Sequence, residues 1–399
     1  MTNIELSSIL ASIQDALRSI SPYIHKTPLV YSNSFSKMFD AEVYIKAENL
    51  QKTGSFKVRG AFNKLMKFKT DKVIAASMGN HAQGVAFAAA GLGIKAKIAM
   101  PLTASIVKQE ATKGYGAEVV LHGETFSDAL NYAISQKDYT FIHAFDDEDI
   151  IAGQGTIGLE IANELQDIDV VLVPVGGGGL ISGISIAIKS LSPDSEVIGV
   201  QTVSATSAYD SFHTRGIVER IPRPTLADGI AVGRIGNKTF EVMQRYVDDI
   251  IKVSEESIAM SVLLFLERKK LVVEGAGAVP LAALIEQKDR FKDKRIVLVV
   301  SGGNIDFTLI DRIIHKGLVS SGRIGVFKVI VDDVPGGLHK ITGIIAAQRG
   351  NILNVVHDRL SQDVPIGKTM VIFTVETKGA VHLEEIISAI RESGFRILQ

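Results

Sequence analysis

Lys57 is the side chain in this sequence best suited to nucleophilic chemistry. It lies between Phe56 and Val58 in the segment GSFKVRGA, residues 54–61, which reads as the opening of a helix. Most lysines are solvated surface residues, and spacing alone would leave Lys57 among them. An apolar setting, however, disfavours the charged ammonium and lowers the lysine pKa, which suits an amine that forms a Schiff base. Lys57 is therefore a candidate catalytic residue.

Four successive glycines, Gly176, Gly177, Gly178 and Gly179, separate a Val-rich run from an Ile/Ala-rich run. Glycines let backbone N–H groups turn toward one point, and the start of a helix adds positive potential, so such a loop suits a phosphate. The alternative is a tight turn, which rarely needs four glycines. The pattern is neither GxGxxG nor a P-loop ending in GK[ST], so a dinucleotide or ATP has no direct support.

Two further polar loops follow strand-like runs, SMGNHAQG at residues 77–84 and VVSGGNID at residues 299–306. The first opens a helix, and its free N–H groups suit an anion such as a carboxylate, although a well-capped helix start explains it equally well. Ligands in parallel α/β folds gather at the carboxyl ends of strands. Turn formation alone does not explain four such loops, so together they predict a binding site.

The elements that position these loops alternate between strand and helix from about residue 72 to residue 316. Repeated strand–helix–strand order predicts mostly parallel sheets covered on both faces, and the length of the region predicts two sheets. The expected strands are residues 71–77, 95–101, 117–123, 169–175, 195–202 and 294–304, and the helices between the first of them are residues 81–93, 105–116 and 125–137.

The pattern changes after Gly322, and residues 318–323, with their Ser and Gly content, read as a linker. The order that follows is β-α-β-β-α-β, the ferredoxin-like arrangement. The expected elements are a strand at 323–333, a helix at 334–351, strands at 352–361 and 368–377, a helix at 380–394 and a last short strand at 395–399.

Composition excludes several classes of function. The formal net charge of −1, without a basic block, argues against nucleic acid and anionic membrane as partners, and the absence of cysteine excludes disulfides and a catalytic thiol. Residues 170–188 carry no charge over about the length of a membrane span, but Pro174 and the glycines favour a strand, a loop and a helix. No histidines stand at metal-ligand spacing, so no metal site is expected. The N-terminus lacks a secretory pattern, and we expect a cytoplasmic protein.

Taken in order, the motifs GSFKVRGA, SxGNHAQG, GGGGL and SGGN resemble those of the fold type II pyridoxal-phosphate enzymes, and among them the threonine ammonia-lyases. The segment DDVPGGLHKITGIIAAQRGNI, residues 332–352, resembles the opening of an ACT regulatory domain. The resemblance implies an α/β catalytic domain at residues 1–320, with a small subdomain at about 48–146 inserted in the large one. A ferredoxin-like, ACT-like α+β domain would follow at residues 323–399.

The resemblance also implies roles for individual residues. Lys57 would hold pyridoxal 5'-phosphate as a Schiff base and move the substrate α-proton, and Ser301 would contact the pyridine nitrogen. A serine at that position does not demand a protonated ring, so loss of the β-hydroxyl is favoured. The other implied cofactor contacts are Phe56 beside the ring, Asn80 at the 3-hydroxyl oxygen, and the backbone of Gly176, Gly177, Gly178, Gly179 and Leu180 at the phosphate.

The resemblance further implies that Ser77, Asn80 and His81 lie in the loop that takes the substrate carboxylate. Two residues depart from relatives. Met78 replaces a serine that moves protons in serine racemases, so racemisation is disfavoured. Gln201 replaces a glutamate that binds a cation in some relatives, so a divalent site is doubtful.

The expected reaction is deamination of L-threonine to 2-oxobutanoate and ammonia, with L-serine to pyruvate as a side activity. Such enzymes usually serve isoleucine biosynthesis or threonine breakdown. The alternatives are a serine or hydroxyaspartate ammonia-lyase, a β-replacement synthase, and a non-catalytic amino-acid sensor on the same fold.

The resemblance implies a homodimer or homotetramer that an amino-acid effector regulates. The effector, isoleucine or valine first, is expected near one C-terminal domain and its partner copy. The expected contacts are Pro335, Gly336, Gly337 and Leu338, with Asn351 and Ile352 of the partner copy.

Overall fold

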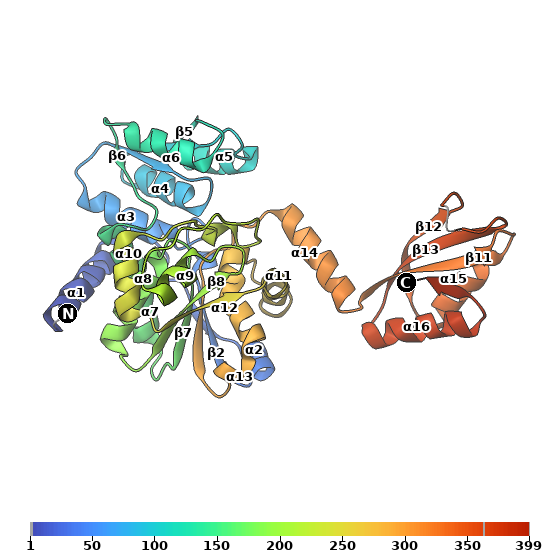
Figure 1. The fold of residues 1–399 in the computed structure, drawn as a ribbon. Helices are drawn as coiled ribbons and strands as arrows, with labels where there is room; N and C mark the ends of the chain where they lie inside the picture. The colour runs from blue at the N-terminus through green and yellow to red at the C-terminus, as the bar shows by residue number, and fades with distance from the viewer. Residues whose placement is uncertain (1–2, 362–363, 399) are drawn as a thin grey trace. The chain divides into compact units, whose positions relative to one another are not determined.

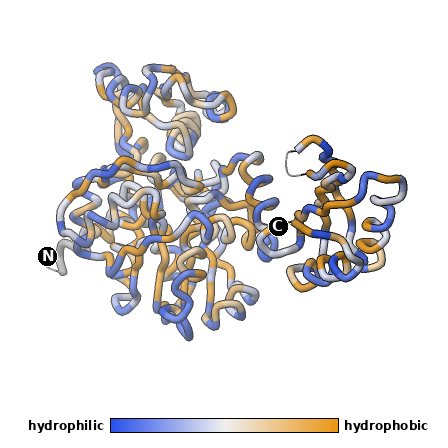
Figure 2. The backbone as a smooth tube through the Cα atoms, turned by 45° about the vertical axis from the view of Figure 1, so that its right-hand side comes forward, coloured by the Kyte–Doolittle hydropathy of each residue, from blue (hydrophilic) through white to orange (hydrophobic). Residues whose placement is uncertain are grey.

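The computed structural model describes residues 3–361 and 364–398, and the chain forms two compact units, Met1–Ile305 and Asp306–Gln399 (Figure 1). Each unit has its own hydrophobic core. Figure 2 shows that the hydrophobic residues follow the strands inside each unit, whereas hydrophilic residues concentrate in the loops and on the outer helices.

The larger sheet of the first unit has six strands in the order β1-β2-β10-β7-β8-β9. Only the β1–β2 pair is antiparallel. All five residues of β7 are buried, as expected for a central parallel strand covered on both faces. The strands are β1 (Leu29–Tyr31), β2 (Glu42–Ala47), β7 (Val170–Pro174), β8 (Glu196–Thr202), β9 (Asp249–Val253) and β10 (Arg295–Val300).

Helices cover both faces of this sheet (Figure 1). α7 and α8 contact each other along their lengths, and α12 packs on β7, β9 and β10. The α-helices are α1 (Asn3–Ile20), α2 (Asn33–Phe39), α7 (Glu148–Glu164), α8 (Gly179–Leu191), α9 (Ser207–Thr214), α10 (Asn237–Tyr246), α11 (Glu255–Leu264), α12 (Gly275–Glu286) and α13 (Lys288–Phe291). Three short turns of other helix types are η1 (Glu48–Leu50), η2 (Asp228–Ile230) and η3 (Phe265–Lys269).

The smaller sheet of the first unit is parallel, with the order β5-β4-β3-β6. Its elements lie inside the stretch from 48 to 146 that the sequence assigns to a small subdomain. They are α3 (Lys57–Lys67), β3 (Lys72–Ala76), α4 (Asn80–Gly91), β4 (Lys95–Met100), α5 (Ile106–Lys113), β5 (Glu118–Leu121), α6 (Phe126–Ser135) and β6 (Thr140–Phe141). The predicted two-sheet α/β architecture is confirmed.

Two glycine pairs bring α3 close to α7, and α7 close to α8. A Cβ on Gly153 of α7 would lie 2.6 Å from the Cα of Gly60 on α3. A Cβ on Gly183 of α8 would lie 2.4 Å from the backbone N of Gly155 on α7. Because no side chain separates these backbones, α3, which begins at Lys57, packs directly on α7, and α7 packs on α8.

The second unit contains an antiparallel sheet with the order β12-β13-β11-β14. Buried residues alternate along β11 and meet apolar residues of α15 and α16. The elements are α14 (Phe307–Ser320), β11 (Ile324–Asp332), α15 (Gly337–Ala347), β12 (Asn351–Asp358), β13 (Lys368–Glu376), α16 (Ala380–Glu392) and β14 (Arg396–Leu398). The predicted β-α-β-β-α-β order is confirmed, and Gln399, the end of the last predicted strand, lies outside the described residues.

The two units divide at residue 305, earlier than the boundary expected near residue 320. The difference is α14, which packs against β11 and so groups with the second unit. Within the described residues, no helix combines the length and the apolar character needed to cross a membrane.

Candidate active site

Lys57 is the first residue of α3, and its Nζ donates a hydrogen bond of 3.0 Å to the backbone oxygen of Ala144. Burial lowers the Lys57 pKa to about 8, although the negative charge of Glu274 opposes this shift. The ring of Phe56 lies beside the amine, with its centroid 5.1 Å from Nζ. A lysine with a lowered pKa supplies more neutral amine near neutral pH than a surface lysine does.

Ser301 follows β10 and lies beside the segment that leads into α3. The backbone N of Phe56 donates to the oxygen of Ser301 at 3.1 Å, and Ser55 forms an isolated antiparallel bridge with Gly302. Ser301 is 3% exposed, and no group among the described residues hydrogen-bonds to its hydroxyl. Two loops that are more than 240 residues apart in the chain thus run side by side. The buried hydroxyls of Thr53 and Ser55 in the first loop also have no hydrogen-bond partner among the described residues.

The four glycines lie between the end of β7 and the first turn of α8. Gly178 has a φ of +95°, which favours glycine, and a Cβ there would lie 2.8 Å from the Cβ of Thr239. The oxygen of Gly177 accepts a hydrogen bond of 2.7 Å from the Thr239 hydroxyl, which holds the loop. The first N–H groups of a helix have no partner inside it, so those of Gly179 and Leu180 are available to an anion.

Asn80 begins α4, and its side chain connects the start of α12 with the loop after β10. Its Nδ2 lies 2.8 and 3.1 Å from the two carboxylate oxygens of Glu274, and its Oδ1 accepts a 2.8 Å hydrogen bond from Asn304. Glu274 is 5% exposed, and burial raises its pKa to about 7. The sequence did not assign Glu274 to the site. The only available signal was one acidic residue in the apolar segment VEGAGAVP, residues 273–280.

Ser77 and His81 lie on either side of the start of α4. The Ser77 hydroxyl accepts a 3.1 Å hydrogen bond from the N of Gly79, which shapes the loop. His81 is buried, with Nε2 3.1 Å from the oxygen of Ile142. Burial, and secondarily the charge of Lys57, lower the His81 pKa to about 3, so the ring is neutral at physiological pH. His81 therefore contacts the β6 side of the helix.

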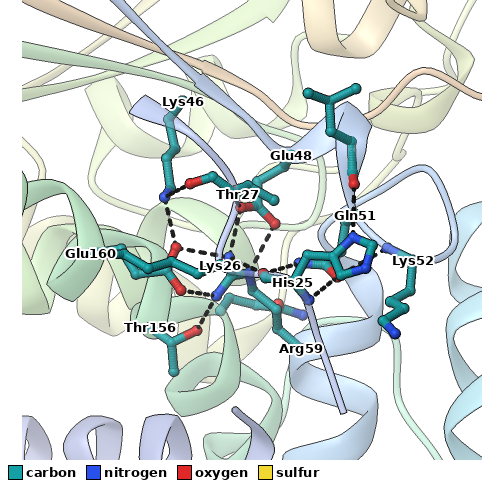
Figure 3. Close-up of polar contacts among 12 residues, drawn as sticks. His25, Lys26, Thr27, Lys46, Glu48, Gln51, Lys52, Arg59, Thr156 and Glu160 are labelled. Carbon is teal, nitrogen blue, oxygen red and sulfur yellow. Dashed lines mark hydrogen bonds and ion pairs between the residues drawn. The ribbon is translucent and has the colours of Figure 1, made fainter. Parts of the chain in front are cut away.

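A buried ionic cluster, which we call the Arg59 cluster, consists of Arg59, Glu48, Glu160 and Lys46 (Figure 3). Arg59 donates to both oxygens of Glu160 at 2.7 and 2.9 Å, and Lys46 Nζ lies 2.6 Å from Glu160 Oε2. Two cations and two anions balance one another, as burial of charge requires. The sequence did not assign any of these residues, although Arg59 follows Lys57 by two positions in the same motif.

The expected effector residues occupy the two ends of α15 in the second unit. Pro335 to Leu338 form the turn and first residues of α15, where Gly336 has a φ of +89°. Asn351 and Ile352 begin β12 after the helix has ended. An 11-residue helix spans about 16 Å, so one chain does not bring the two groups together. A joint site would need a partner copy, as the sequence-based expectation assumed.

Comparisons with known proteins agree on one family. Residues 20–302 match the family described as pyridoxal-phosphate dependent enzyme. The L-threonine ammonia-lyase of Thermotoga maritima is 48% identical over 97% of this chain and 98% of its own length. Among solved structures, threonine deaminase isoform 2 of Solanum lycopersicum has a TM-score of 0.76 and 35% identity over 79% of this chain and 89% of its own. Maize serine racemase has a TM-score of 0.72 and 32% identity over 78% of this chain and 98% of its own.

Proposed function

The chain belongs to the family of pyridoxal-phosphate-dependent enzymes, and from this premise we propose that it is a threonine ammonia-lyase. It would convert L-threonine to 2-oxobutanoate and ammonia, with L-serine to pyruvate as a side activity. The observation that carries the proposal is the Lys57 amine, held with a lowered pKa where the strand-end loops of both sheets meet. The near full-length similarity to an L-threonine ammonia-lyase supports the choice of substrate.

The residues present fit pyridoxal 5'-phosphate. The glycine loop leaves no space for a Cβ at Gly177 or Gly178, so only glycine keeps this backbone open to a phosphate. The free Ser301 hydroxyl suits a neutral pyridine nitrogen, and the neutral form of Lys57 suits an aldehyde. The cofactor, when bound, supplies an electron-withdrawing ring that stabilises negative charge at the substrate α-carbon.

Lys57 is proposed to do two things in sequence. Its amine would hold the cofactor's aldehyde carbon, and in the presence of substrate the neutral amine would accept the proton of the substrate α-carbon. A pKa of about 8 leaves a useful neutral fraction near neutral pH. The ring of Phe56 excludes water from one side of this amine.

Ser301 and Met78 are proposed to favour elimination over other outcomes. A serine hydroxyl would donate to the pyridine nitrogen without carrying a charge, so the ring would withdraw less negative charge from the substrate α-carbon. Breaking of the bond between the β-carbon and its hydroxyl would then be favoured over reprotonation of the α-carbon. The thioether of Met78, beside the Asn80 loop, cannot return a proton from the opposite face. Racemisation would need such a donor.

Two loops would bind the anionic groups of the cofactor and of the substrate. Backbone N–H groups of Gly176 to Leu180 would bind the cofactor phosphate, and the loop of Ser77, Asn80 and His81 would bind the substrate carboxylate. Because His81 is neutral, that loop would attract the carboxylate by its N–H groups and not by an imidazolium charge.

Regulation and assembly are a separate part of the proposal. The second unit has the ferredoxin-like order of an ACT-like domain, and we place an amino-acid effector between the turn at Pro335–Leu338 and the partner copy's β12 edge. Such a site would require a homodimer or homotetramer, because within one chain these two groups of residues lie at opposite ends of α15. A cytoplasmic location is also proposed, and the metabolic enzymes that the chain resembles support it.

The test is keto-acid release by the purified, cofactor-loaded protein with L-threonine, L-serine and hydroxyaspartate supplied separately. We expect threonine to have the highest kcat/KM and Lys57→Ala to abolish release. Lys37→Ala, at an exposed position of α2, serves as the control and should keep wild-type activity. Release from hydroxyaspartate alone, or wild-type turnover by Lys57→Ala, would overturn the assignment.

A further inference from the structure

A chain of hydrogen bonds runs from a backbone carbonyl to a buried carboxylate across the candidate active site. Asn304 Nδ2 donates to the oxygen of Thr53 at 2.8 Å and to Oδ1 of Asn80 at 2.8 Å. Asn80 Nδ2 in turn donates to Glu274, 2.8 Å from Oε1 and 3.1 Å from Oε2. Four segments that are distant in the sequence are thereby joined through two side-chain amides.

Both ends of this chain accept only, as long as Glu274 is ionised. A backbone carbonyl has no proton to give, so Asn304 must present its NH2 group to Thr53. An ionised carboxylate has none either, so Asn80 must present its NH2 group to Glu274. An amide side chain is otherwise free to exchange its oxygen and nitrogen by rotation. Here the two acceptors fix the orientation of both amides.

The fixed orientation determines which hydrogen-bonding groups of Asn80 are available to a ligand. Its oxygen already accepts from Asn304, and one of its two amide hydrogens is directed to the Glu274 carboxylate, whose oxygens are both within reach. The second amide hydrogen remains. In this orientation the remaining amide hydrogen is a donor that Asn80 can offer a ligand.

The position of Glu274 is itself constrained. Its backbone N donates to the oxygen of Gly302 at 3.1 Å, and a Cβ on Gly302 would lie 2.4 Å from Glu274 Oε1. The carboxylate thus lies directly against the residue after Ser301, with no space for a side chain between them. The Glu274 carboxylate is therefore a buried and fixed part of the candidate site.

We propose that Glu274 is a positioning residue that orients the Asn80 amide, so that Asn80 donates to the 3-oxygen of the bound pyridoxal ring. The inference rests on the proposed function, in which Asn80 contacts that oxygen. A donor stabilises the deprotonated oxygen, whereas an amide turned the other way would place its own oxygen against it. The burial that raises the Glu274 pKa to about 7 adds a consequence. Protonated Glu274 can donate, so the orientation is less strictly held at acidic pH.

The test compares two cofactors on the cofactor-free, full-length protein. Pyridoxal 5'-phosphate and its 3-deoxy analogue are titrated into wild type, Glu274→Gln and the control Glu256→Gln, which removes the same charge from an exposed position of α11. A glutamine can donate or accept and so permits both orientations of Asn80. We expect Glu274→Gln to weaken pyridoxal 5'-phosphate binding about 10-fold and binding of the analogue less than about two-fold. The control should change neither.

A second variant guards against a folding defect at the buried position. Asn304 is exposed, so Asn304→Ala should fold, and removing its donor should produce the same selective loss. Equal weakening of both cofactors by both site variants would overturn the positioning role. Because the readout is binding, it does not depend on the amino acid that is deaminated. Selective loss without threonine turnover would support the role of Glu274 and refute only the proposed substrate.

Discussion

Arg59 donates to both carboxylate oxygens of Glu48, from Nε to Oε2 and from Nη2 to Oε1, each at 2.8 Å. Both side chains are fully buried. Burial alone would raise the Glu48 pKa, but the charge and hydrogen bonds of Arg59 hold it below its usual value. Because Arg59 lies in the first turn of α3, this pair ties the turn that carries Lys57 to η1, and Glu160 ties it to α7.

Arg59→Met should destabilise the first unit and displace Lys57. The substitution leaves two buried carboxylates without their main partner, which costs about 3–5 kcal/mol. We expect the thermal midpoint of the cofactor-free protein to fall by roughly 5 °C or more, with weaker cofactor binding. Scanning calorimetry measures the first effect. Arg18→Met, which removes a surface pair with Asp15, is the control. Equal shifts for the two variants would contradict the buried cluster as an anchor.

The Lys57 amine should react at lower pH than the other lysines. Since its pKa is lowered to about 8, the neutral form increases as pH rises through 8. Ordinary lysines are half neutral only at a pH of about 10.4, their unperturbed pKa. Brief labelling of cofactor-free protein with an acetylating reagent across pH 6–11, read by mass spectrometry, gives a midpoint for each lysine in one experiment. A Lys57 midpoint no lower than that of exposed lysines would show that the amine is not desolvated.

Gly178→Ala should weaken cofactor binding without unfolding the chain. The new Cβ meets Thr239 at 2.8 Å and requires a φ of +95°, so the loop must shift. Such strain is worth about 1–3 kcal/mol, and we expect a roughly 10-fold or greater loss of pyridoxal 5'-phosphate affinity. Gly216→Ala, where a Cβ meets nothing within 4 Å, should leave affinity unchanged. The prediction fails if phosphate-free pyridoxal loses affinity to the same extent as the phosphorylated cofactor.

An amino-acid effector should change the threonine saturation curve through the second unit. An effector acts only if it binds two conformational states of the enzyme with different affinity. Isoleucine or valine should therefore change the KM for threonine, or the sigmoidicity of the threonine saturation curve, in the full-length enzyme. A chain ending at Ser320 should keep turnover and lose the shift. Steady-state kinetics with and without each amino acid measures this. A shift that survives the truncation would place the effector site outside residues 321–399.

The sequence alone determined the features that depend on neighbours in the chain. The four successive glycines indicated the loop at 176–179, and the Val-rich run before them indicated the buried strand β7. Alternating apolar residues indicated β11. The motif around Lys57 also sufficed to predict a candidate amine and, by resemblance, the cofactor. These features are local because helix and strand periodicity and turn chemistry act over a few residues.

Only the tertiary structure decided which distant side chains share a site. Glu274 and Asn80 are separated by 194 residues, and Arg59 and Glu160 by 101, so no local pattern pairs them. Their contacts depend on how α3, α4, α7 and the start of α12 pack. The same holds for α14, whose helical pattern is visible in the sequence but whose packing on β11 groups it with the second unit. A buried charge must be paired, so the role of a carboxylate in an apolar segment or of an arginine in a motif depends on its partner. The sequence does not show which residue that partner is.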